Sequence, residues 1–149
     1  MKRAHRPILV VGVVFASVMA VVVVSRWMTP REIVPWRDDF AAAQAEAKAS
    51  GKPMMVYFTA DWCAPCHTLK GTTWADRQVE EALRAYVPTR VDVMVNASIA
   101  MKYDAEFLPT FVVLDAEGNV VRSADGYRDP KEFLAWLNGP RAAPRERGG

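Results

Sequence analysis

The chain contains two cysteines, which stand three positions apart in the motif Cys63-Ala64-Pro65-Cys66. A pair at this spacing can exchange disulfides when the first cysteine begins a helix, because unpaired N–H groups and the helix dipole there stabilise an accessible thiolate and lower its pKa. The second cysteine then lies one turn further along the same side, within reach of a disulfide. Pro65 costs no hydrogen bond in a first turn and holds φ near the helical value. Because there is no third cysteine, the pair must exchange electrons with another molecule.

Three other uses of the pair are possible. A structural zinc site needs four ligands, and only Cys63, Cys66 and His67 are close in sequence, so no metal site is expected. An inert disulfide closing so short a loop would stabilise the fold little. The run Cys-Ala-Pro-Cys-His also matches the attachment motif of c-type haem, with Met94 or Met101 as a second axial ligand. Strand-like surroundings are wrong for a small helical cytochrome, so redox exchange is favoured and the haem electron-transfer protein stays open as an alternative.

Charge is distributed unevenly along the chain. Five of the 19 basic residues precede the first acidic residue, Glu32, which leaves 14 basic residues against 17 acidic ones in the remainder. A mildly acidic domain offers no electrostatic surface for nucleic acid, so nucleic-acid binding is excluded.

The N-terminal segment predicts a membrane anchor. Basic residues within 1–7 precede an uncharged, valine-rich run over 8–25, which as a helix spans about 27 Å, near the lower limit for a bilayer. Trp27 follows as an aromatic of the kind found at membrane interfaces. Residues 1–28 are therefore expected to form an uncleaved transmembrane helix in the inner membrane, with its basic end cytoplasmic and the rest of the chain in the periplasm or its equivalent. Cleavage after small residues such as Ala20 or Ser25, giving a secreted protein, is the alternative.

The remaining chain divides into a linker over 29–37, a domain over 38–139 and a disordered tail over 140–149. Within the domain, turn residues and apolar periodicity predict alternating helices and strands. Helices are expected over 40–49 (capped by Asp38 or Asp39), 63–70, 76–86 (capped by Asp76), 97–103 and 129–138, and strands over 54–59, 89–95, 110–114 and 120–123. This order indicates an α/β domain with a central mixed sheet flanked by helices. Phe58, Trp74, Phe111 and Trp136 are expected in its core.

Two stretches resemble the thioredoxin family. Residues 56–66, Val-Tyr-Phe-Thr-Ala-Asp-Trp-Cys-Ala-Pro-Cys, look like the strand, turn and active-site helix of thioredoxins, and Leu108-Pro109-Thr110 matches their segment with a cis-proline. A closer likeness is to the C-terminal domain of the thiol:disulfide interchange protein DsbD, through residues 73–79. The resemblance covers roughly 40–138. It implies a thioredoxin fold and a thiol–disulfide oxidoreductase with no cofactor beyond its own cysteine pair.

The resemblance also implies roles for individual residues. Cys63 would attack, Cys66 would resolve the mixed disulfide, and Trp62 would shield the pair. Pro109 is predicted to be cis, and the backbone of Leu108 could pair with an extended substrate segment. The expected partners are protein thiols and disulfides and a membrane electron donor such as a DsbD-type carrier. The Ala-Pro dipeptide and these likenesses favour a reductase.

One position departs from the family pattern. Tyr57 and Arg90 occupy the places where thioredoxins carry a buried aspartate, which relays the proton of the resolving cysteine, and a nearby lysine. Tyrosine, with an ordinary pKa of about 10, is a poor base near neutral pH. His67 lies four residues after Cys63 and, as a cation, could favour the thiolate. A non-catalytic binding module with this fold is the second alternative function.

Overall fold

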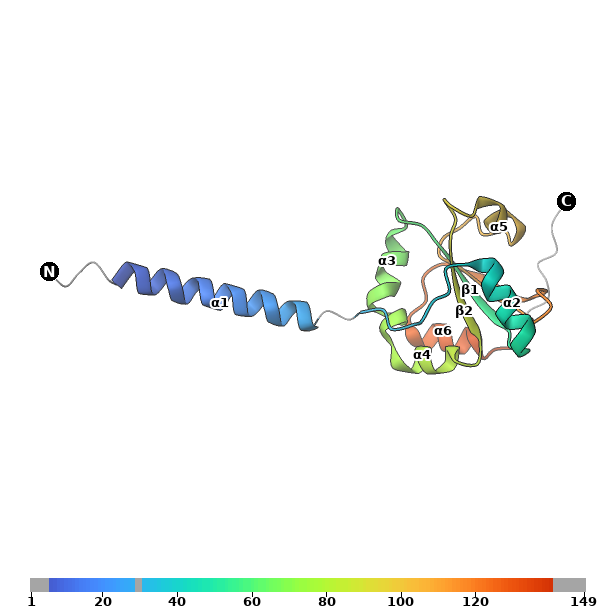
Figure 1. Cartoon of the computed structure of the whole chain (residues 1–149), viewed down its shortest axis with the longest axis horizontal. Coiled ribbons are helices and arrows are strands. Elements are labelled where there is room, and N and C mark those ends of the chain that lie inside the picture. The colour runs from blue at the N-terminus through green and yellow to red at the C-terminus, as the bar shows by residue number, and fades with distance from the viewer. Residues whose placement is uncertain (1–5, 29–30, 141–149) are drawn as a thin grey trace. The chain divides into compact units, whose positions relative to one another are not determined.

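The computed structural model describes residues 6–28 and 31–140, and the chain divides into two compact units, Met1–Pro30 and Arg31–Gly149 (Figure 1). The first unit contains helix α1, Arg6–Met28. Large apolar side chains described between Val10 and Val24 are exposed. In the part of the chain that the structure describes, no helix combines the length and the hydropathy needed to cross a membrane. The predicted tail lies outside the described residues, apart from Pro140.

The second unit is built on a four-stranded mixed sheet with the strand order β2-β1-β3-β4. The central strand β1, Met54–Thr59, is buried along its whole length and pairs in parallel with β2, Val87–Asp92. On its other side it pairs antiparallel with β3, Thr110–Leu114, which in turn pairs antiparallel with β4, Val120–Asp125. A strand covered on both faces needs apolar side chains on both, as the sequence Met-Met-Val-Tyr-Phe-Thr provides.

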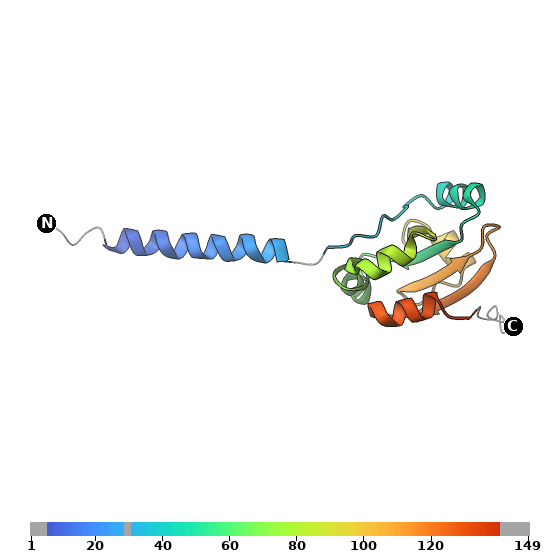
Figure 2. The same ribbon diagram turned by 90° about the horizontal axis from the view of Figure 1, so that it is seen from below.

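Helices cover both faces of this sheet, and Figure 2 shows α2 and α6 on opposite sides. Alternate residues of β1 therefore belong to two separate buried clusters: Met55 and Tyr57 pack with residues of α3, α4 and α6, whereas Val56 and Phe58 pack with residues of α2 and α5. The helices are α2 (Phe40–Ser50), α3 (Ala64–Gly71), the 3₁₀ turn η1 (Thr73–Ala75), α4 (Arg77–Leu83), α5 (Ala97–Lys102) and α6 (Pro130–Leu137). The predicted α/β class is confirmed.

Several helix starts are confirmed by side-chain caps. Asp39, and not Asp38, caps α2 by accepting a hydrogen bond from the backbone N–H of Ala42 at 3.0 Å. Asp76 accepts from two backbone N–H groups at the start of α4, and Asp129 forms a capping box at the start of α6. Three of the four predicted core aromatics are fully buried, and the fourth, Trp136, is half-buried and packs against Phe111.

Predicted boundaries were wrong in three elements. The strand expected over 120–123 continues to Asp125. The helix expected over 76–86 ends at Leu83, and β2 begins at Val87, where its backbone N–H donates to Pro53 O at 2.8 Å. The strand expected over 89–95 ends at Asp92, because the Asp92 carboxylate accepts from the backbone N–H of Met94 and turns the chain out of the sheet.

Residues 31–37, expected as a linker, pack against the domain. The backbone N–H of Ile33 donates to Trp74 O at 2.8 Å, Val34 is buried, and Arg37 forms a parallel bridge with Thr89 at the edge of β2. The Trp36 ring lies against Trp74. The apolar side chains of this segment thus cover the aromatic cluster on one side of the sheet. The first two residues of the expected linker, 29–30, lie outside the described residues.

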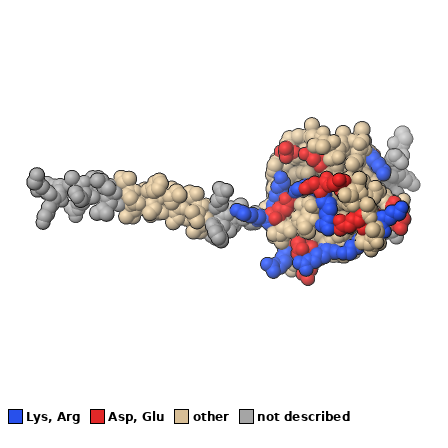
Figure 3. All heavy atoms as spheres, in the orientation of Figure 1, with Lys and Arg blue, Asp and Glu red and all other residues tan. Residues whose placement is uncertain are grey.

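Acidic and basic side chains both lie on the face of the second unit seen in Figure 3, and the coloured part of α1 carries no charge.

Candidate active site

The two cysteines lie where β1 gives way to α3. Cys63 is the N-cap of α3, with extended backbone angles (φ −81°, ψ 96°), and its sulfur accepts a hydrogen bond from the backbone N–H of Cys66 at 3.3 Å. Pro65 occupies the first turn, as predicted, where its missing N–H breaks no helical bond. A sulfur at a helix N-terminus receives both the N–H group and the dipole that stabilise a thiolate.

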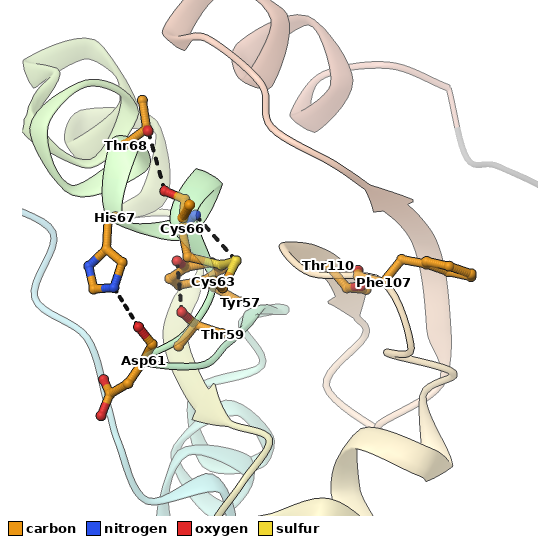
Figure 4. Close-up of a disulfide and its surroundings, with 10 residues drawn as sticks. Tyr57, Thr59, Asp61, Cys63, Cys66, His67, Thr68, Phe107 and Thr110 are labelled. Carbon is orange, nitrogen blue, oxygen red and sulfur yellow. Dashed lines mark hydrogen bonds between the residues drawn. A yellow bond between two sulfur atoms is a disulfide. The ribbon is translucent and has the colours of Figure 1, made fainter.

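Cys63 and Cys66 are joined by a disulfide with an S–S distance of 2.04 Å and a Cα–Cα distance of 5.2 Å (Figure 4). Cys63 is 3% exposed and Cys66 1%. The accessible sulfur expected for Cys63 is therefore largely covered in this oxidised form. Of the two residues, the one at the helix start is the less buried.

The segment before β3 supplies the remaining backbone feature of the site. The Leu108–Pro109 peptide bond is cis, as predicted. Leu108 is half-buried and packs against the cluster that contains both cysteines. The Thr110 hydroxyl fixes this loop through Phe107 O and through Asp125 Oδ1, the latter at 3.0 Å. The pairing of Leu108 with a substrate backbone stays a prediction.

Trp62 lies directly before the pair and is 67% exposed. Its indole Nε1–H donates to the sulfur of Met94, in the loop between β2 and α5, at 3.5 Å. Met94 and the neighbouring Val95 are themselves exposed. The indole is therefore anchored to an apolar rim beside the active site, and its predicted shielding role stays a prediction.

Tyr57 lies in the same buried cluster as the two cysteines. The side chain is fully buried, and its hydroxyl donates to Thr59 Oγ1 at 3.1 Å. Burial is the main cause that raises the pKa of Tyr57 above its ordinary value, so the phenol keeps its proton near neutral pH. Sequence reasoning singled out Tyr57 but missed Thr59. Their spacing of two residues on a strand, which places both on one face, was the available signal.

Arg90 lies beside Tyr57 in the β1–β2 register, and its charge is neutralised by carboxylates. Its guanidinium binds Asp38 with two hydrogen bonds, at 2.8 and 3.2 Å, and Glu32 at 3.3 Å. Burial lowers the pKa of Arg90, but its hydrogen bonds to Asp38 and the nearby carboxylates outweigh burial and raise it. Arg90 is therefore a permanent cation held away from proton transfer. Glu32 and Asp38 were missed as its partners because they come from the segment expected to be a linker or a cap.

A cavity of about 440 Å³ opens beside Cys66. Its lining is mainly polar and charged: Asp38, Thr59, Ala60, Asp61, Cys66, His67, Lys70, Arg90, Asp92, Val95 and Asn96. The His67 ring lies in this lining, with Nε2 at 2.6 Å from Asp61 O, so that this nitrogen carries the proton it donates to the carbonyl (Figure 4). His67 thus binds a loop carbonyl, and in Figure 4 its ring points away from the disulfide.

The haem alternative does not fit this arrangement. Haem attachment would need both sulfurs beside a large apolar slot, whereas the cavity at Cys66 is charged and Met94 and Met101 are exposed at the surface. Among the described residues, no group of three or more His, Cys, Asp or Glu side chains is placed to hold a metal ion. What the geometry provides is a cysteine pair at a helix N-terminus, in a buried cluster that also contains Tyr57 and that Leu108 of the cis-proline segment packs against.

Comparisons with known proteins agree with this geometry. The family described as "Thioredoxin-like domain" matches residues 40–139. The thiol:disulfide interchange protein DsbD of Yersinia pestis (strain Pestoides F) is 33% identical over 97 residues, which are 61% of this chain and 16% of that protein. DsbD of Pseudoalteromonas atlantica is 32% identical over 110 residues, 70% of this chain and 19% of that protein. The chain therefore spans less than a fifth of the length of either relative.

Two solved structures extend the comparison. A thioredoxin from Thermus thermophilus is 31% identical, with a TM-score of 0.62, over 74% of this chain and 85% of that one. The oxidised C-terminal domain of DsbD from Neisseria meningitidis is 23% identical, with a TM-score of 0.57, over 68% of this chain and 95% of that one. The second likeness shows a shared fold.

Proposed function

Because the chain belongs to the thioredoxin-like family and is a thiol–disulfide oxidoreductase, we propose that it works as a membrane-anchored reductase of protein disulfides outside the cytoplasm. The observation that carries the proposal is the position of Cys63, whose sulfur accepts the Cys66 N–H at the start of α3. This arrangement favours a thiolate at Cys63 and keeps Cys66 within bonding distance of it.

The reaction follows from the two sulfurs. In the reduced protein the Cys63 thiolate attacks a substrate disulfide, forms a mixed disulfide and expels one substrate thiolate. The Cys66 sulfur then attacks Cys63, which forms the Cys63–Cys66 disulfide and releases the second substrate thiol. Two electrons pass to the substrate, and a dithiol donor then supplies two more by reducing the Cys63–Cys66 disulfide through the same kind of exchange.

Exchange with protein thiols and disulfides is supported by the relatives, which are named thiol:disulfide interchange proteins. The Ala64-Pro65 dipeptide and the likeness to a thioredoxin favour the reducing direction. A chain with two cysteines has no internal relay, so its electrons must come from another protein. We propose a membrane carrier of the DsbD type as donor and extracytoplasmic protein disulfides as substrates.

Anchoring is supported by the composition of the N-terminal segment. Residues 8–25 carry no charged side chain, basic residues precede them, and α1 runs through the whole stretch with its described valines exposed. A basic flank favours the cytoplasmic side, which would put Arg31–Gly149 outside. The alternative is secretion after cleavage of the N-terminal segment, and the location experiment below distinguishes it from anchoring.

The direction is tested by trapping the redox state of Cys63 and Cys66 in intact cells. Acid quenching followed by a mass-tagged alkylating reagent should find the pair mostly reduced, and mostly oxidised once the membrane donor is removed. A Cys66→Ser variant should accumulate mixed disulfides with substrate proteins, whereas Cys63→Ser should form none. A pair that is mostly oxidised in unperturbed cells would contradict a reductase, and full activity in Cys63→Ser would favour a binding module.

The location is tested by protease treatment of cells whose outer barrier has been opened. The protease should digest the second unit. In cells without protease, the intact chain should be recovered in the membrane fraction. Protection until the inner membrane is lysed would contradict an extracytoplasmic domain, and recovery in the soluble fraction would favour cleavage.

A further inference from the structure

Cys66 must become a thiolate in a buried place. Its residue is 1% exposed, and burial in apolar surroundings raises the pKa of a thiol. The resolving step nevertheless requires the thiolate, since the thiol is a poor nucleophile. Some neighbouring group must therefore favour the charged sulfur.

Two hydroxyl groups belong to the surroundings of Cys66. Tyr57 shares a buried cluster with both cysteines, and Thr59 lines the same cavity as Cys66. Figure 4 shows their hydroxyls joined by a hydrogen bond beside the disulfide, with the oxygen atoms 3.1 Å apart. Because the Tyr57 hydroxyl donates to Thr59 Oγ1, the Thr59 proton is left to donate to another acceptor.

Charged and titratable groups from four segments line the cavity together with Cys66. They are Asp38 before α2, Asp61 in the β1–α3 loop, His67 and Lys70 on α3, and Arg90 and Asp92 on β2. Most are already engaged with one another or with the backbone. Asp38 is held by Arg90 at 2.8 Å, Asp92 accepts from Met94 N at 2.8 Å, and His67 Nε2 is bound to Asp61 O at 2.6 Å.

We propose that Thr59 donates a hydrogen bond to the Cys66 thiolate as it forms, and that Tyr57 is the positioning residue that directs the Thr59 hydroxyl toward the sulfur. The two hydroxyls form a chain in which each hydrogen bond polarises the next. Tyr57 cannot serve as the base instead, because burial raises the pKa of its phenol. The proposal rests on the exchange reaction of the cysteine pair and is independent of its direction.

The proton and electron balance of this step is simple. Cys66 gives its proton to solvent in the cavity, which is polar and roomy enough for water. Its sulfur then bonds to Cys63, the bond between Cys63 and the substrate sulfur breaks, and the departing thiolate takes a proton from solvent. No outside oxidant or reductant takes part.

The experiment uses the reduced full chain and an aromatic disulfide reagent, dithiobis(nitrobenzoate), whose thiolate absorbs light on release. The first release reports attack by Cys63, and the second reports resolution by Cys66, so the two steps are read separately across pH. A hydrogen bond to a charged sulfur lowers its pKa by about one unit, which is about tenfold in thiolate at neutral pH.

In Thr59→Val we expect the second release to slow about tenfold at neutral pH and its pH midpoint to rise by about one unit. Tyr57→Phe should raise the pH midpoint by less. Thr59→Ser keeps the hydroxyl, so its midpoint should match that of the unsubstituted chain. The first release should change less than about twofold in all three. Tyr103→Phe is the matched control, since its buried hydroxyl has no partner among the described residues and belongs to the other buried cluster.

An unchanged pH midpoint in Thr59→Val would overturn the proposal, and so would an equal shift in Tyr103→Phe. Loss of the first release in the unsubstituted chain would instead refute the exchange reaction itself. If Thr59→Val does not fold, the midpoint in Tyr57→Phe decides, because the phenyl ring keeps its packing.

Discussion

Replacing Trp36 by alanine should destabilise the domain, although Trp36 lies in a segment whose prolines suggest a linker. The Trp36 ring is half-buried, with centroid distances of 5.4 Å to Tyr57 and 5.0 Å to Trp74, and its Nε1–H donates to Glu32. Truncating a fully buried tryptophan costs about 3–5 kcal/mol, and each aromatic pair adds about 0.5–1.5 kcal/mol. For a ring buried by about half we expect the free energy of unfolding to fall by about 2–3 kcal/mol.

Urea denaturation of a fragment beginning at Arg31, followed by far-ultraviolet circular dichroism, measures this change. With a slope of about 1–3 kcal/mol per molar urea, the midpoint should fall by about 0.7–3 M in Trp36→Ala. Trp62→Ala is the matched control, because that ring is 67% exposed, and its free energy of unfolding should stay within about 0.5 kcal/mol of the original. Equal midpoints for the two variants would refute the inference that residues 31–37 are part of the folded domain.

Three further outcomes are expected. In the reduced protein, Cys63 should be alkylated at neutral pH far faster than Cys66, as mass spectrometry of the two peptides would show; equal, slow rates would count against an activated thiolate. Asp129→Ala should lower the free energy of unfolding by about 1 kcal/mol, because the backbone N–H of Glu132 loses its acceptor, and an unchanged urea midpoint would show that the cap contributes nothing. Folding raises the pKa of Tyr57, so the folded state keeps that proton longer and stability should fall as pH rises above about 10; Tyr57→Phe should lose less stability over this range, and parallel curves would contradict the account.

The start of α3 could be predicted because its signals are local. An apolar strand, a turn and the run Cys-Ala-Pro-Cys are adjacent in sequence, and each restricts the conformation of the next. The cis bond at Pro109 could not be derived from its own neighbours, and the resemblance to thioredoxins carried that prediction, which the structure confirms.

The end of β2 was misplaced because apolar residues were taken as buried. Met94 and Val95 continue the apolar pattern of the strand, yet they are 68% and 79% exposed in the loop that contacts Trp62. Apolar residues that form a surface rim beside an active site have the same periodicity as a buried strand, so the sequence pattern alone does not separate them.

Contacts between distant segments were also beyond the sequence. The Arg90 ion pairs with Glu32 and Asp38 join residues more than 50 positions apart, and no local spacing signals them. Thr59 was overlooked for a different reason, since its chemistry depends on the orientation that Tyr57 gives to its hydroxyl.

The reduction potential of the Cys63–Cys66 pair tests the central claim most directly. The reduced and oxidised forms would be equilibrated against thiol buffers and quantified after alkylation. A two-electron couple near about −270 mV, the region of thioredoxin, is the expected result for a reductase fed by a membrane donor. A value near about −120 mV, the region of the oxidant DsbA, would contradict the reducing direction, and the absence of any reversible couple would contradict the enzyme itself.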